Sequence, residues 1–216
     1  MITKIIALII VTILASFATT PPISQASSSD IKKREGIYQY AFITYGPAFV
    51  PICLTLNTLI YAWIMISPDP YPFNGIDKLS EWTLVDIVSF ALILLGGLLR
   101  IWCYRTLGRF FTFAVVIQHD HKLIKDPPYS LVRHPSYTAA IMVTAGLFGF
   151  YYPLGEAIFG EYGQTITVFV IATTSIMTVY FFAKRVQYEE REMAMKFKDE
   201  WEEYARSRYR FIPYMI

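Results

Sequence analysis

Residues 162–183 read YGQTITVFVIATTSIMTVYFFA and contain no Asp, Glu, Lys or Arg. A helix needs about 20 mostly apolar residues to cross the hydrocarbon core of a bilayer. Residues 37–68 and 135–155 are free of these charged residues as well. A chain of 216 residues has too little polar sequence to bury three such helices inside a soluble core. The sequence therefore predicts an integral membrane protein that spans the bilayer several times.

The composition indicates to which classes of protein the chain can belong. The chain is 55% hydrophobic and 17% charged, whereas a typical soluble domain has about 45–50% and about 25%. Its net charge of +2, with no basic stripe interleaved with aromatic residues, predicts no nucleic-acid partner. Cys53 and Cys103 lie in apolar runs, so we expect small buried side chains, with neither a disulfide framework nor a metal site.

The apolar pattern predicts an all-α, polytopic transmembrane helix bundle with about five spans. The spans are expected at residues 5–18, within 38–66, at 82–104, from 135 to 152 or 153, and at 164–182. The first run is short and resembles a signal peptide, but the membrane character of the rest of the chain favours a span. Asp86 and Arg100 lie near the two ends of the third span, where we expect their charges to snorkel to the interface.

The segment after the fifth span, residues 184–208, is charged but keeps a helical pattern. One stripe of this segment is apolar, which predicts a C-terminal amphipathic helix on the membrane surface. The stripe consists of Val186, Met193, Phe197, Trp201 and Tyr204. We expect two parts: an N-terminal transmembrane region with two spans, residues 1–81, and a membrane core with this helix, residues 82–216.

Basic residues predict which way the bundle faces. With five spans, residues 32–34, residues 105–133 and the stretch from Lys184 onward fall on one side and hold most of the Lys and Arg. The opposite connections, 67–81 and 154–163, carry five carboxylates and one lysine. The basic segments and the C-terminus are therefore expected in the cytosol.

Two polar clusters lie on this predicted cytosolic side. One runs from His121 to the RHPSY element at residues 133–137, and the other is Arg185 with Glu189 and Glu190. Arg185 and Glu189 share a helix face, which is more often a plain stabilising pair than a functional one. His134 could simply cap a helix. Together, however, these ionisable groups at the mouth of an apolar bundle indicate a functional site.

These residues closely resemble the isoprenylcysteine carboxyl methyltransferase family. The matching elements are LGRFF at 107–111, HKLI at 121–124, Tyr129, RHPSY at 133–137, Glu189-Glu190, Phe197, WEEY at 201–204 and RFIP at 210–213. The resemblance covers roughly residues 82–213. RHPSY is shared with a wider superfamily of membrane methyltransferases and sterol reductases, but its spacing to the Arg/Glu helix favours the methyltransferase.

The resemblance implies a multi-pass enzyme of the endoplasmic reticulum membrane that uses S-adenosylmethionine, with its active site facing the cytosol. It would methylate the C-terminal carboxylate of prenylated cysteine in CaaX-processed proteins, with the prenyl chain entering from membrane lipid. By motif position, Arg185 is expected to face that carboxylate. The residues expected to bind the cofactor are His121, Lys122, Leu123, Ile124, Tyr129, His134, Pro135, Ser136, Tyr137 and Glu189.

Two alternatives remain on the sequence alone. One is another enzyme of the superfamily, a phospholipid methyltransferase or an NADPH-dependent sterol reductase, although the reductases are usually much longer. The other is a non-enzymatic, degenerate membrane protein, which the intact motifs disfavour. The chain also departs from the family at Pro127 and Ala139, where glycine is usual. Pro127 would stiffen the loop under the cofactor, and Ala139 adds a methyl group at a helix-packing or cofactor-facing position.

Overall fold

The computed structural model describes residues 1–20, 37–67, 79–111 and 122–211. Five of the described helices are long and apolar enough to cross a membrane. They are α1 (Ile2–Thr19), α3 (Ile37–Ile66), α5 (Leu84–Leu107), α6 (Pro135–Phe159) and α7 (Gly163–Phe197). The shorter helices are η1 (Gly108–Phe110), η2 (Gly160–Tyr162) and α8 (Asp199–Ser207). The prediction of an all-α, multi-pass membrane bundle is confirmed.

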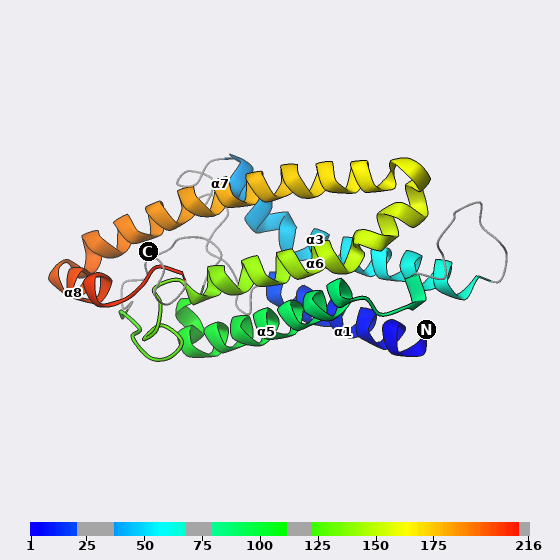
Figure 1. Cartoon of the computed structure of the whole chain (residues 1–216). Coiled ribbons are helices and arrows are strands. Elements are labelled where there is room, and N and C mark those ends of the chain that lie inside the picture. Colours follow the sequence, from blue (N-terminus) through cyan, green and yellow to red (C-terminus); the bar gives the residue numbers. More distant parts are fainter. Residues whose placement is uncertain (21–36, 68–78, 112–121, 212–216) are drawn as a thin grey trace.

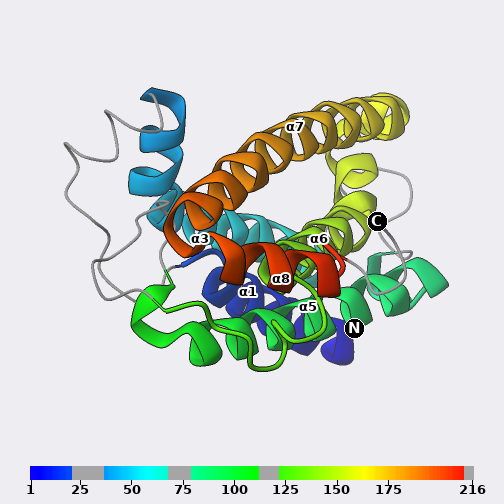
Figure 2. The same cartoon turned by 90° about the vertical axis from the view of Figure 1, so that its left-hand side faces the viewer.

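The long helices run alongside one another, with the start of α1 at one end and α8 at the other (Figure 1). The end of α5, the start of α6 and the charged part of α7 all lie at the α8 end. Figure 2 looks onto this end and shows α8 lying across the front of the bundle. The chain therefore gathers its polar motifs at one end of an apolar bundle.

Among the described helices, α5 and α6 have the most extensive contact. A Cβ on Gly146 would lie 2.6 Å from the Ser89 carbonyl oxygen, and one on Gly96 would lie 2.9 Å from the Ala139 carbonyl oxygen. Small residues allow such close backbone approach between membrane helices. Ala139 is fully buried here, so the methyl group that departs from the family's glycine lies at a helix-packing position.

Helix α1 packs against α3 and α5, as expected of a span. Its Lys4 is fully buried, with Nζ 3.1 Å from Asp86 Oδ2 and 2.7 Å from the Glu81 carbonyl oxygen. Asp86 also forms a capping box with Thr83 at the start of α5. The prediction that Asp86 snorkels is wrong, because Lys4 satisfies its charge inside the bundle.

The predicted end of the fourth span at residues 152–153 is also wrong. Helix α6 continues through Pro153 to Phe159, and Leu154 and Ala157 beyond the proline belong to the hydrophobic core. Proline removes one backbone donor, but membrane helices tolerate it where neighbouring groups compensate. Core packing therefore outweighs the local tendency of proline to end a helix.

The fifth span and the charged segment form one continuous helix rather than a span followed by a surface helix. The 35 residues of α7 make a helix about 52 Å long, well beyond the roughly 30 Å of a bilayer core. It ends at Phe197, and the capping residue Lys198 has a φ of 47°, which lies in the left-handed region. The amphipathic helix is instead the short α8, which buries Trp201 and Tyr204. The predicted division of the chain at residue 81 stays a prediction.

Candidate functional site

A cavity of about 440 Å³ lies at the α8 end, bordered by α1, α3, α5, α6 and α7. Most of its wall is apolar, and its charged groups come from α5 and α7. Of the predicted site residues, Ser136, Tyr137, Arg185 and Glu189 line it, and Arg100 joins them. RHPSY and the Arg/Glu helix, two motifs that are far apart in sequence, therefore meet at one cavity.

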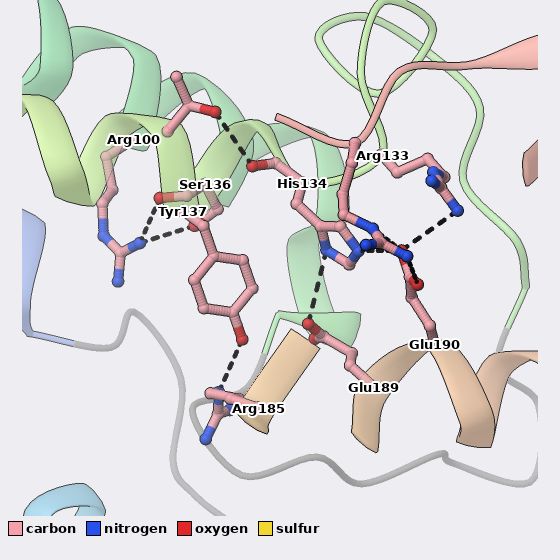
Figure 3. Close-up of polar contacts among 10 residues, drawn as sticks. Arg100, Arg133, His134, Ser136, Tyr137, Arg185, Glu189 and Glu190 are labelled. Carbon is pink, nitrogen blue, oxygen red and sulfur yellow. Dashed lines mark hydrogen bonds and ion pairs between the residues drawn. The ribbon is translucent and has the colours of Figure 1, made fainter. Parts of the chain in front are cut away.

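Arg185 lies on α7 and is only 8% exposed. Its Nε donates a hydrogen bond to the Tyr137 hydroxyl at 2.8 Å, as Figure 3 shows. A buried guanidinium beside an apolar cavity is costly without polar partners. Arg185 is therefore not an ordinary exposed residue of a surface helix.

His134 lies between two carboxylates of α7 (Figure 3). Its Nδ1 is 3.7 Å from Glu189 Oε2, and its Nε2 is 3.0 Å from Glu190 Oε1. It occupies the N-cap position of α6, but its side chain does not cap that helix. Glu189 Oε2 is buried and has no hydrogen-bond partner among the described residues. A buried carboxylate oxygen of this kind, next to a cavity, suits a cationic ligand.

Glu190 links the C-terminal segment to the RHPSY element, because its carboxylate contacts an arginine of each. It accepts hydrogen bonds from Nε and Nη2 of Arg210 at 3.1 and 2.8 Å, and Arg133 Nη1 lies 3.2 Å away. Main-chain bonds reinforce the junction, because Arg133 donates to the Tyr209 carbonyl at 2.8 Å and His134 to the Arg210 carbonyl at 2.9 Å. The motif placed Glu190 near the site, and the structure gives it a scaffolding position.

The loop before RHPSY is held from the other side by α8. Tyr204 of α8 donates a hydrogen bond to the Tyr129 carbonyl at 2.8 Å, and Lys125 Nζ lies 2.9 Å from Glu200 Oε1. Burial raises the pKa of Tyr129 well above its usual value and that of Tyr204 to about 12. Both phenols therefore stay neutral at physiological pH.

The structure does not bring every predicted cofactor residue to the cavity. Lys122, Leu123 and Ile124 lie in a stretch without regular secondary structure, and neither they nor Tyr129 are among the described residues that line the cavity. His134 stands behind Glu189, and Pro135 is buried as the first residue of α6. His121 lies outside the described residues.

Arg100 is a site residue that the sequence interpretation missed. Its Nε lies 2.6 Å from the Ala18 carbonyl oxygen and 2.9 Å from the Tyr104 hydroxyl. Its Nη1 donates to the carbonyl and the hydroxyl of Ser136 at 2.8 and 2.7 Å (Figure 3). The prediction that Arg100 snorkels is wrong, because polar groups of α1, α5 and α6 satisfy it inside the bundle. An ionisable residue within a span was the available signal.

Comparison with known proteins agrees with the motifs. The sequence model of the isoprenylcysteine carboxyl methyltransferase family matches residues 88–195, half of the chain. A probable protein-S-isoprenylcysteine O-methyltransferase of Oryza sativa subsp. japonica is 28% identical over 142 residues, covering 64% of this chain and 66% of the relative. The chain thus spans just under two thirds of that relative's length.

Protein-S-isoprenylcysteine O-methyltransferase A of Arabidopsis thaliana is 27% identical over 188 residues, covering 82% of this chain and 86% of the relative. The B protein of the same plant is 29% identical over 121 residues, 54% of this chain and 53% of the relative. No solved structure gives a significant match. On the match of the family model to half of its length, the chain belongs to the isoprenylcysteine carboxyl methyltransferase family.

Proposed function

We propose that this protein methylates the C-terminal carboxylate of prenylated cysteine, with S-adenosylmethionine as the methyl donor. Arg185 carries the proposal, because it places a buried guanidinium in the wall of a largely apolar cavity. A cavity of this character suits a ligand that has one anionic group and a long apolar chain. The rice and Arabidopsis relatives are named as enzymes of this class.

The residues beside the cavity fit S-adenosylmethionine, which carries cationic and polar groups. Glu189 would hold a cationic group through its buried Oε2, with His134 behind it. Ser136 and Tyr137 would contact the cofactor from α6. When bound, S-adenosylmethionine supplies an activated methyl group on a sulfonium centre. The other residues proposed to complete this site are His121, Lys122, Leu123, Ile124, Tyr129 and Pro135.

The substrate carboxylate needs orientation rather than a general base. A C-terminal carboxyl has a pKa near 3.3–3.7 and is ionised at neutral pH. Arg185 would neutralise it and fix its direction through two parallel donors. Helices α3 and α7 border the cavity and carry exposed apolar side chains on their outer faces. We propose that the prenyl chain enters there from the bilayer, which would leave water excluded from the reacting groups.

The direct test is methyl transfer in membranes that contain the expressed chain. Label from S-adenosylmethionine is expected to appear on N-acetyl-S-farnesylcysteine, and not on its carboxamide or on N-acetylcysteine. Transfer to phosphatidylethanolamine instead would identify a phospholipid methyltransferase. Reduction of a sterol by NADPH would identify a reductase. A folded chain with none of these activities would contradict the proposal of an enzyme.

We further propose that the protein lies in the endoplasmic reticulum membrane with its α8 end in the cytosol, because the basic residues gather at that end. Lys198 at the junction of α7 and α8 is exposed, as is Glu81 at the opposite end. In a variant without Cys53 and Cys103, Lys198→Cys should react with an impermeant maleimide on sealed microsomes. Glu81→Cys should react only after permeabilisation. The reverse pattern would contradict this orientation.

A further inference from the structure

Tyr137 bridges the first turn of α6 and the helix that carries Arg185. Its ring centroid lies 5.7 Å from that of His134 and 5.1 Å from that of Phe182 on α7, both with edge-on geometry. Figure 3 shows the ring directed from α6 toward Arg185, whose Nε lies 2.8 Å from the hydroxyl. Ring contacts on two sides therefore hold the hydroxyl at a defined position beside the guanidinium.

This hydrogen bond determines which edge of Arg185 can meet an anion. A guanidinium presents its N–H donors in a rigid planar fork. Because Nε donates to Tyr137, a bidentate contact with a carboxylate has to use the edge formed by Nη1 and Nη2. The hydrogen bond also restricts rotation of the guanidinium plane, so the direction of that edge is set before a ligand arrives.

The chemistry of the partner matters as well. A phenol can accept a hydrogen bond from Arg185 without adding a negative charge that would compete with the carboxylate of a ligand. A carboxylate in the same place would neutralise the guanidinium and weaken its attraction for a second anion. As a neutral acceptor, Tyr137 thus orients the guanidinium without itself placing an anion beside it.

We infer that Tyr137 is a positioning residue for the substrate carboxylate, acting through Arg185. The inference rests on the proposed function and adds to the contact with the cofactor expected from the RHPSY element. It assigns the Tyr137 hydroxyl to the binding of the anion and leaves both packing and the proposed cofactor contact to the ring, which Tyr137→Phe retains.

The variant Tyr137→Phe tests this role, because it removes the hydroxyl and keeps the ring. With S-adenosylhomocysteine present, the Kd of N-acetyl-S-farnesylcysteine is expected to rise about tenfold, the scale of one hydrogen bond to a charged group. The Kd of S-adenosylhomocysteine itself should change by less than about twofold. The methyl ester of the substrate has no anion, so its affinity should also stay within about twofold.

A double-mutant cycle separates action through Arg185 from an independent effect. In an Arg185→Met background, adding Tyr137→Phe should change the Kd of N-acetyl-S-farnesylcysteine by less than about twofold, because no guanidinium remains to be oriented. Unchanged binding of S-adenosylhomocysteine shows that each variant has folded.

Three results would overturn the inference: full additivity of the two substitutions, equal weakening of the methyl ester, or a loss confined to S-adenosylhomocysteine. These would indicate an independent contact, general packing or a cofactor contact, respectively. A wild-type protein that binds S-adenosylhomocysteine but not N-acetyl-S-farnesylcysteine would instead refute the proposed substrate, and the inference with it.

Discussion

Arg185→Ala is expected to leave the protein folded and to lower methyl transfer to N-acetyl-S-farnesylcysteine on the order of 30- to 5,000-fold. A carboxylate that reaches a buried site has lost much of its water, and leaving it unpaired is costly. Losing a charge-assisted contact to such an anion costs roughly 2–5 kcal/mol. Arg185→Lys should also lose most turnover, because an ammonium group is a point charge without the planar fork.

Arg191 provides the matched control, because it is an arginine on the same helix but is exposed. Arg191→Ala should retain activity within about twofold, as expected for a surface substitution. Binding of S-adenosylmethionine should change far less than turnover in both variants, since Glu189 and the RHPSY segment remain. If Arg185→Ala expresses normally and stays within about threefold of wild type, Arg185 does not bind the carboxylate.

Asp86→Ala is expected to lower the free energy of unfolding by about 3–5 kcal/mol, the usual result of removing one partner of a buried ion pair. Lys4 is fully buried and would retain only the Glu81 carbonyl oxygen as a described partner at hydrogen-bond distance. The capping box at the start of α5 would be lost as well. Equilibrium unfolding in mixed detergent micelles measures the change.

The double variant Lys4→Met with Asp86→Ala should recover most of that loss, because apolar replacement of a buried pair is often neutral or stabilising. Glu81→Gln changes an exposed carboxylate two residues before Thr83, the N-cap of α5, and should stay within about 0.5 kcal/mol of wild type. A single Asp86→Ala variant within about 1 kcal/mol of wild type would mean that the buried pair contributes little.

Apolar runs, three of them free of charged residues, placed the five long helices, because few structures other than a helix can cross hydrocarbon without exposing backbone polar groups. Helix ends were less predictable. Proline tends to end a helix, but α6 continues past Pro153 because the residues that follow it pack in the hydrophobic core. After Ala183 the change from apolar to charged sequence marks where α7 leaves the apolar core, and not where it ends.

Charged residues within the spans were misjudged because their partners are remote in sequence. Asp86 meets Lys4 of α1, and Arg100 meets the Ala18 carbonyl and Ser136. No local pattern reveals such contacts. For the same reason no sequence pattern indicated that α1 contributes residues 18–19, and α3 residues 46, 47 and 50, to the cavity wall.

The candidate site was predictable where a motif names its residues. RHPSY and the Arg/Glu pair meet at the cavity, as the resemblance implied, and Tyr137 contacts Arg185 directly. The placement of Lys122, Leu123 and Ile124 away from the cavity wall was not predictable, because it depends on how α8 and the C-terminal segment hold the loop. Their roles, and that of His121, stay predictions.

Because α7 is uninterrupted, its apolar membrane span and its charged C-terminal part tilt together as one helix. Arg185 and Glu189 lie on α7 just after its apolar stretch. Their distance from the hydrocarbon core of the bilayer therefore depends on the tilt of this one helix. Helices tilt more when the surrounding bilayer is thinner than their apolar length. A change in bilayer thickness would therefore move the Arg185 guanidinium relative to the lipid headgroups, even when no ligand is bound.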